Sequence, residues 1–218
     1  MLGVKIMEQY LAKILRTLPK GSWCSEFKAI RMAELIVEHK PQVCVEIGVF
    51  GGDTLFVMAQ ALKHVGSGMV YGIDPWSHDD AIEGMDPKGV NFPWWSGKEG
   101  GLSLENVYRS AKVKRVGMML EKQCELIRTR ADNAETLARF ADVSIGFFHF
   151  DGNHGQQAVE DARLWLPKLA PGCILFHDDV NWTEGGQKHN ADAFEYFLDH
   201  GFSTLEEMIG DCAILRKN

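Results

Sequence analysis

Short, continuous apolar runs alternate along this chain with longer stretches of helical period. The apolar runs predict strands at 43–47, 69–73, 125–128, 143–150, 173–176, 203–206 and 212–215. The central runs are apolar at consecutive positions, which is typical of parallel strands that helices cover on both faces. The pattern therefore predicts an α/β fold with a doubly wound sheet.

The helical patterns between these strands lie at 53–64, 103–113, 134–140, 156–166 and 190–200, and we expect Pro167, Pro171 and Gly172 to end the fourth one. Two more helices, 5–18 and 25–39, precede the first strand, and we expect them to pack as an N-terminal cap over residues 1–40 or to form a surface for a partner. Since the chain has 218 residues, 45% of them hydrophobic, we expect a single domain over 1–218. Apolar faces on the first two helices are compatible with a homodimer.

The segment 76–101 has three tryptophans and five glycines but no helical or strand period. Loops of this length inside a compact domain are usually functional or disordered, and the aromatic residues favour an ordered segment. We expect a lid or substrate loop here, with Trp94 and Trp95 at its tip. A packed surface loop is the alternative interpretation.

The composition excludes several classes of function. A net charge of −7, from 23 basic and 30 acidic residues, argues against nucleic-acid binding and against binding to anionic membranes. Apolar runs are too short to cross a bilayer, and the charges within the first 16 residues do not fit a signal peptide. Five cysteines without a C-x-x-C pair do not suggest a disulfide framework, so we expect a cytoplasmic protein.

The first predicted strand breaks into Gly48-Val-Phe-Gly-Gly-Asp-Thr54 before a helix begins. Glycines allow a tight turn and a close approach to a ligand, and the helix start offers free N–H groups, so the turn indicates a nucleotide-like ligand. Glu46 and Asp74 are placed to accept hydrogen bonds from it at the carboxyl edge of the sheet. The spacing differs from G-x-G-x-x-G, which disfavours a hydride-transfer enzyme; an ordinary glycine-rich turn remains the alternative.

Acidic residues follow two other apolar runs: Asp151 after 147–150, and Asp178 with Asp179 after 173–176. Parallel strands carry both ends to one edge, where the repulsion between these acids calls for a cation; oxygen ligands favour magnesium or manganese over zinc. His154 suits a general base beside that ion, or is a helix cap or surface residue. Two further histidines lie inside apolar runs and are expected to be hydrogen-bonded core residues: His149 and His177.

Together these features resemble the class I S-adenosylmethionine-dependent methyltransferases, more narrowly the metal-dependent O-methyltransferases of the catechol and macrolide-sugar type (methyltransferase family 24). The resemblance is carried by the segments 45–54, 151–154 and 176–179. It implies a Rossmann-like, mostly parallel seven-stranded sheet with an antiparallel last strand. It also implies that S-adenosylmethionine contacts Glu46 and Gly48 at its methionine part, Asp74 at its ribose, and Asp132 or Asn133 at adenine; Gly52 and Thr54 complete the cofactor-binding residues.

The same resemblance implies that Mg²⁺ (or Mn²⁺) binds Asp151, Asp178 and Asp179, and that His154 is the base, as in the sugar-modifying branch. The catechol branch has asparagine where Asp179 stands and a lysine base near the first aspartate, which this chain lacks. The implied function is magnesium-dependent methyl transfer to a hydroxyl of a small molecule, whether a sugar, a phenol or a secondary metabolite. Asp53 departs from the family turn, which commonly has a small residue there.

Two other functions fit the same residues. One is a protein that binds the cofactor without catalysis and uses its N-terminal helices and the segment 76–101 to bind a partner. The other is a metal-assisted hydrolase in which His154 activates water. Binding of S-adenosylmethionine would distinguish the hydrolase from both other functions.

Overall fold

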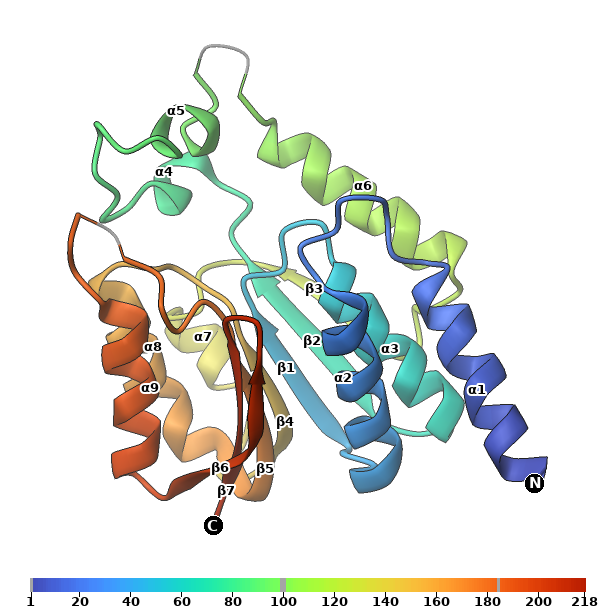
Figure 1. Cartoon of the computed structure of the whole chain (residues 1–218). Helices are drawn as coiled ribbons and strands as arrows, with labels where there is room; N and C mark the ends of the chain where they lie inside the picture. The colour runs from blue at the N-terminus through green and yellow to red at the C-terminus, as the bar shows by residue number, and fades with distance from the viewer. Residues whose placement is uncertain (1, 99–100, 184) are drawn as a thin grey trace.

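The computed structural model describes residues 2–98, 101–183 and 185–218. Within these residues one seven-stranded sheet has the order β3-β2-β1-β4-β5-β7-β6 (Figure 1). The strands β1 to β5 run parallel to one another, whereas β7 pairs antiparallel with both β5 and β6. The predicted α/β fold with a mostly parallel sheet and an antiparallel last strand is therefore confirmed.

The strands agree with the apolar runs to within a few residues, except at one boundary. Their bounds are β1 Val43–Ile47, β2 Met69–Asp74, β3 Cys124–Arg128, β4 Ile145–Phe150, β5 Leu169–His177, β6 Phe202–Ile209 and β7 Cys212–Lys217. The exception is β5, which already contains Pro171 and Gly172, so the prediction that both residues precede the strand was wrong. Pairing passes from Ile145 with Leu169 to Phe147 with Ile174, and the bulge between these pairs accommodates the proline that cannot donate a hydrogen bond.

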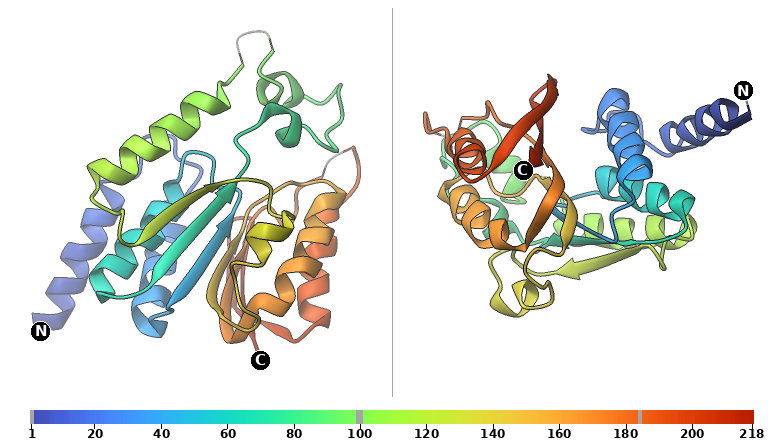
Figure 2. Two further views of the ribbon diagram at one scale, coloured as in Figure 1. Left: turned by 180° about the vertical axis from the view of Figure 1, so that it is seen from behind. Right: turned by 90° about the horizontal axis from the view of Figure 1, so that it is seen from below.

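Helices cover both faces of the sheet (Figure 2). On one face lie α2 (Glu26–His39), α3 (Asp53–Val65) and α6 (Leu104–Gly117), with α1 (Leu2–Leu15) against α2; on the other lie α7 (Ala134–Leu137), α8 (Gln156–Trp165) and α9 (His189–Asp199). Each face has its own buried apolar cluster. No helix within the described ranges is long and apolar enough to span a membrane.

The segment after β2 contains two helical turns that the periodicity did not predict: α4 (His78–Ala81) and α5 (Phe92–Trp95). Both lie beyond the carboxyl edge of the sheet (Figure 1). Helices of four residues are too short to show a 3.6-residue period, so the pattern could not reveal them. Residues 99 and 100 of the predicted loop 76–101 lie outside the described residues.

Candidate active site

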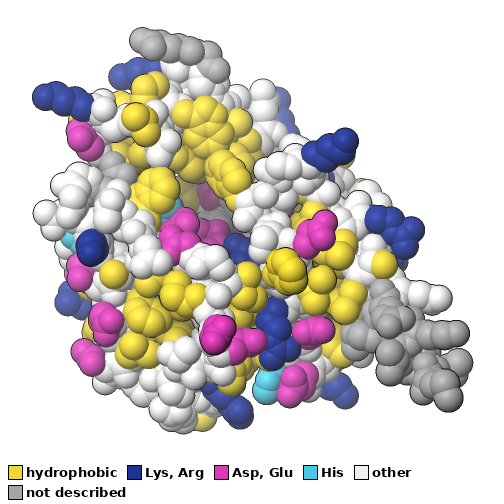
Figure 3. Space-filling view, viewed as in Figure 1, with side chains coloured by type: hydrophobic (Ala, Val, Ile, Leu, Met, Phe, Trp, Pro, Cys, Tyr) yellow, Lys and Arg dark blue, Asp and Glu magenta, His cyan; other side chains and the backbone are white. Residues whose placement is uncertain are grey.

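A cavity of about 760 Å³ opens at the carboxyl ends of β1, β2, β4 and β5. Figure 3 shows acidic side chains inside this hollow and hydrophobic side chains around its rim. The volume lies in the usual range for small-molecule sites. Its position is the edge that the sequence predicted, because parallel strands bring all their carboxyl ends to one side.

Backbone crowding explains the first glycine of the turn after β1. Gly48 has φ +80°, and a Cβ there would lie 1.7 Å from the carbonyl oxygen of Asp151. Gly52, with φ +80°, occupies the left-handed position just before α3. Gly51 has open space around it, since the nearest atom to an added Cβ is Lys114 Nζ at 3.9 Å. The backbone of Asp151, directly after β4, therefore excludes a side chain at position 48. Position 51, in contrast, has space for a Cβ.

Asp74, at the end of β2, holds this turn in place. Its Oδ2 accepts hydrogen bonds from the backbone N–H groups of Val49 (3.0 Å) and Phe50 (2.8 Å), and its Oδ1 accepts one from Trp76 N (2.6 Å). Burial raises the pKa of Asp74, while these three hydrogen bonds oppose that rise. A carboxylate has more acceptor positions than these three donors occupy, so Asp74 also keeps capacity for a ligand hydroxyl.

Glu46 lies in a fully buried polar row beneath the cavity. Register pairs it with His149 on β4, and strand alternation turns both side chains toward α2 and α3. Its Oε1 accepts a hydrogen bond from the Thr54 hydroxyl and lies 3.2 Å from His149 Nδ1. Its Oε2 is buried with no hydrogen-bond partner among the described residues. Glu46 itself does not line the cavity, although Ile47 and Gly48 directly after it do.

The side chains predicted to lie near adenine are engaged with other protein groups. Arg130 donates to both carboxylate oxygens of Asp132, at 2.9 and 3.0 Å, which lowers the pKa of that acid. The same guanidinium donates to Asp80 (2.9 Å) and Glu83 (2.5 Å), so it joins the segment after β2 to the loop after β3. Asn133 caps α7 by accepting from Thr136 N. Asp132 lines the cavity; Asn133 has this capping role.

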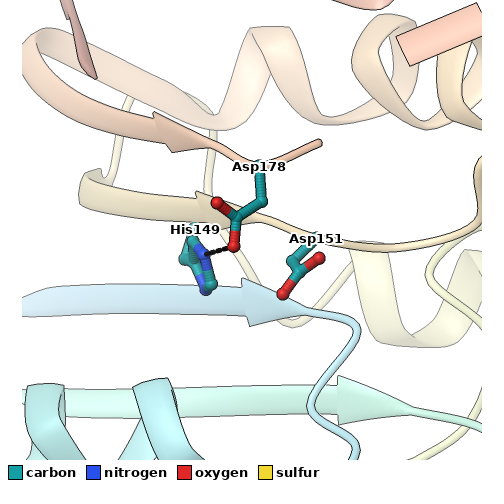
Figure 4. Close-up of side chains that lie close together, drawn as sticks. All are labelled: His149, Asp151 and Asp178. Carbon is teal, nitrogen blue, oxygen red and sulfur yellow. Dashed lines mark hydrogen bonds and ion pairs between the residues drawn. The ribbon is translucent and has the colours of Figure 1, made fainter. Parts of the chain in front are cut away.

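The acids after β4 and β5 meet at the cavity floor, as the parallel strands predicted. Two groups have ligand atoms that all lie within 4.8 Å of one another: His149 with Asp151 and Asp178, and Asp151 with His154 and Asp179. Figure 4 shows Asp151 and Asp178 side by side at their strand ends, with His149 beneath. The predicted set of three aspartates is thus divided between two groups that share Asp151. The inner group adds His149 and Asp178, and the outer group adds His154 and Asp179.

The inner group contains a lysine that sequence reasoning missed. Lys28 of α2 forms an ion pair with Asp178 Oδ2, and its side chain is only 7% exposed. The same oxygen lies 3.4 Å from His149 Nε2. Lys28 belongs to the buried face of α2 together with Met32 and Leu35. A lysine on an apolar helix face is a readable signal, because burying a charge requires a partner.

The side chains of the inner group shift one another's pKa values. Burial alone would lower the pKa of His149, but the carboxylates of Asp178 and Glu46 outweigh burial and raise it to about 10. Although burial would raise the pKa of Asp178, His149 and Lys28 hold it well below its ordinary value. Burial, and then Asp178, raise the pKa of Asp151. Asp151 is therefore the acid that most needs another cation.

The outer group is more open and less completely bonded. His154 Nε2 lies 3.1 Å from Asp179 Oδ2, yet it is shielded from water and has no aligned hydrogen-bond partner in the described part of the chain. Two carboxylates with this orphaned nitrogen beside them fit a hard divalent ion that shares its coordination with a substrate. The residues present thus fit the implied metal.

His177 behaves differently from the expected core histidine. It is fully buried and stacks on Phe150 with ring centroids 4.7 Å apart, as a core residue does. Neither ring nitrogen has a hydrogen-bond partner among the described residues, so the expected hydrogen bonding was wrong. Burial lowers the pKa of His177 to about 4, which keeps the ring neutral near pH 7.

An aromatic cluster covers the side of the cavity next to the glycine turn. Trp23 stacks on Phe50 at 4.8 Å, and Trp94 and Trp95 of α5 contact both rings at 5.7–6.2 Å. All four residues line the cavity. The segment after β2 therefore lies against the glycine turn through Phe50.

Residues 45–180 match a family model described as a methyltransferase domain. The chain belongs to this methyltransferase family. The expected class is thus confirmed as a methyltransferase, whereas the transfer to oxygen and the cofactor remain predictions. No curated protein sequence matches this methyltransferase significantly.

Solved structures with the same fold are O-methyltransferases or methyltransferases of low sequence identity. The Bacillus cereus O-methyltransferase in complex with SAH has a TM-score of 0.63 at 14% identity, with 96% of this chain and 91% of that chain covered. The O-methyltransferase TomG from Streptomyces achromogenes, involved in tomaymycin synthesis and in complex with SAM, has a TM-score of 0.63 at 16% sequence identity. The match covers 95% of this chain and 88% of that chain. The SAH-bound methyltransferase PaMTH1 from Podospora anserina has a TM-score of 0.62 at 12% sequence identity. The match covers 97% of this chain and 86% of that chain.

Proposed function

We propose that this methyltransferase transfers the methyl group of S-adenosylmethionine to a hydroxyl oxygen of a small molecule, with a divalent ion, Mg²⁺ or Mn²⁺, beside Asp151. The observation that carries the proposal is the meeting of Asp151, His154 and Asp179 in the cavity that the glycine turn also lines. The SAM and SAH bound to the structural neighbours support the choice of cofactor.

On the cofactor side, the backbone of the glycine turn and the side chains of Glu46 and Asp74 bind and orient S-adenosylmethionine. Glu46 Oε2 has no hydrogen-bond partner among the described residues, and Glu46 directly precedes the cavity-lining residues Ile47 and Gly48, so we propose it as the acceptor for the methionine part. Asp74 fixes the turn through its backbone hydrogen bonds and offers its remaining acceptor capacity to the ribose. The loop at Asp132 lies near adenine. Fixed donors and acceptors of this kind hold the sulfonium carbon for in-line transfer.

On the acceptor side, His154 is the proposed general base. Its Nε2 is shielded from water, has no aligned hydrogen bond among the described residues, and stands beside Asp179. A histidine in this position accepts the hydroxyl proton as the new C–O bond forms and the C–S bond of the sulfonium breaks. When bound, a divalent ion would lower the pKa of the acceptor hydroxyl and orient it.

The aromatic cluster of Trp23, Phe50, Trp94 and Trp95 excludes water from this reaction. Its rings cover the cavity between the glycine turn and the segment after β2. A nonpolar cover strengthens every electrostatic contact beneath it. We propose that residues 76–101 act as the lid of the site through these contacts.

A cytoplasmic location and a homodimer are further parts of the proposal. All five cysteines are buried and unpaired, which fits a reducing compartment. Two large apolar side chains near the start of α2 are exposed, Trp23 by 66% and Phe27 by 79%, and a second copy of the chain would cover them.

The test measures S-adenosylhomocysteine formed from S-adenosylmethionine with a panel of phenols and sugar hydroxyls, in Mg²⁺ or in chelator. We expect product only when acceptor and metal are both present. Calorimetry with S-adenosylmethionine is run in parallel. Absence of cofactor binding would leave the metal-assisted hydrolase as the better reading, and equal turnover in chelator would remove the metal from the proposal.

A further inference from the structure

Lys28 brings a positive charge into the acid cluster from outside the region that the family model matches. It lies on α2, whereas the match covers residues 45–180. Its ammonium pairs with Asp178, 150 residues away in sequence, and its side chain is 7% exposed. A buried ammonium cannot leave its partner without a large desolvation penalty, so this charge is a fixed part of the site.

Asp178 is consequently poorly placed to bind a divalent ion. Its Oδ2 already contacts the Lys28 ammonium and lies 3.4 Å from His149 Nε2. An ion bound to this carboxylate would lie next to the ammonium, and two positive charges that close repel strongly where water is excluded. Asp151 and Asp179 have no such contact with a lysine or arginine in the described residues.

We propose that Lys28 is the built-in cation of the acid cluster: it neutralises Asp178, so that Asp151 and Asp179 alone supply the carboxylate ligands of the divalent ion. The inference rests on the metal-dependent part of the proposed function. It agrees with the usual coordination of Mg²⁺, which takes one or two carboxylates and leaves its other positions to waters and substrate.

A consequence is that α2 is part of the catalytic unit. Lys28 acts as a positioning residue, because it touches Asp178 and holds the inner acids at a fixed charge beneath the ion. Removing its ammonium would free Asp178 to join Asp151 as a ligand, since both belong to one group with ligand atoms within 4.8 Å.

Binding of Mn²⁺ to the full chain without S-adenosylmethionine, followed by electron paramagnetic resonance, tests the proposal. Asp179→Asn is expected to weaken binding at least about tenfold. The double variant Lys28→Met/Asp178→Asn removes both charges of the pair and is expected to bind Mn²⁺ within about threefold of the wild type. A loss in the double variant as large as that in Asp179→Asn would overturn the proposal, because Asp178 would then be a ligand.

The single variant Lys28→Met is expected to bind Mn²⁺ at least about tenfold more tightly than the wild type, since one more carboxylate faces the ion. Its melting temperature in chelator should fall by at least ~4 °C and recover with Mn²⁺, because the buried Asp178 loses its ion pair with the lysine and keeps only His149 as a partner. The double variant should have a melting temperature close to that of the wild type even in chelator. If the single variant does not fold, the double variant alone decides.

Lys168→Met is the matched control. Lys168 also pairs with an aspartate, Asp142, at 2.7 Å, but precedes β5 and so lies at the opposite edge of the sheet. Its loss should change neither Mn²⁺ affinity nor the metal dependence of the melting temperature. An equal gain in Mn²⁺ affinity in this control would show a general charge effect and overturn the proposal.

Failure of this inference differs from failure of the proposed function. Calorimetry and product formation on the wild type test the methyl transfer itself. If the wild type binds no Mn²⁺, the inference and the metal-dependent part of the proposed function fail together, whereas binding by the wild type with Asp178 as a ligand overturns the inference alone. If none of the variants binds Mn²⁺, the inference fails, while binding of S-adenosylmethionine still tests the cofactor site.

Discussion

The two sides of the cavity treat their acids in opposite ways. At the ends of β1 and β2, Glu46 and Asp74 accept hydrogen bonds from a hydroxyl and from backbone N–H groups of the turn. At the ends of β4 and β5, acids lie close to one another, and burial raises the pKa of Asp151. One side is therefore ordered by the backbone before any ligand binds, whereas the other needs positive charge to be balanced.

The largest effect is expected from Asp151→Asn, which removes the one acid common to both groups. The methyl-transfer rate should fall about 10³-fold, or ~4 kcal/mol in the barrier, because substrate orientation and metal binding are lost together. Affinity for S-adenosylmethionine should stay within about twofold. Rates come from the product assay and affinities from calorimetry. Asp142→Asn, which changes a surface acid paired with Lys168, is the control. If Asp151→Asn kept a tenth of the wild-type activity, the contrast between the two sides of the cavity would be contradicted.

Gly48→Ala tests whether folding of the protein, in the absence of any ligand, requires glycine at the first position of the turn. The added Cβ would lie 1.7 Å from the Asp151 carbonyl oxygen at a positive φ, so the free energy of unfolding should fall by at least ~3 kcal/mol. Gly51→Ala, where there is space, should change it by less than ~1 kcal/mol. Chemical denaturation measures both. Equal losses would mean that the crowding at Gly48 is not what demands glycine.

Asp74→Ala should weaken S-adenosylmethionine binding by about 1.5–3 kcal/mol, the value of charge-assisted hydrogen bonds. Because the N–H groups of Val49, Phe50 and Trp76 also lose their acceptor, the unfolding free energy should fall in parallel. Calorimetry and denaturation on the same preparation separate the two effects. Unchanged affinity would show that the ribose lies elsewhere.

The smallest effect concerns Asp161 of α8, in the cavity wall. Burial raises its pKa from 3.8 to about 7, so the folded chain keeps a proton that the unfolded chain releases near pH 4. Stability from this group should therefore fall as pH rises from about 4 to 7 and stay lower above it. Asp161→Asn should be more stable by about 1–3 kcal/mol at pH 8 but equal to wild type at pH 4. Denaturation at both pH values checks this; a gain that is the same at both would refute the burial effect.

Local pattern was enough to predict most of the fold. The run 43–47 coincides with β1 because its residues, apolar except for Glu46, end at Gly48, a clear boundary. The start of β5 could not be predicted, because Pro171 and Gly172 usually end an element and only the pairing with β4 shows a bulge. Similarly, α4 and α5 have too few residues to produce a period.

The candidate site was predicted in part for the same reason. Asp151 and Asp179 follow apolar runs, and parallel strands must bring such ends to one edge, so their proximity follows from chain order. Lys28 could not be assigned to Asp178, because the helix that bears it has no local relation to β5. The contacts of Asp132 with Arg130 and of Asn133 with Thr136 are local in sequence, so the pattern could have revealed them, whereas the contact of Arg130 with Asp80 joins segments 50 residues apart.

What the sequence alone determined is the edge of the sheet at which the cavity and its acids lie, since hydrophobic period and turn residues are local properties that establish strand direction and strand ends. Only the tertiary structure decided how charge is distributed there: which acid receives a lysine, which ones accept backbone hydrogen bonds, and which ones face one another. Those partners come from elements far apart in the chain, and their contacts depend on how α2 and the segment after β2 pack against the sheet.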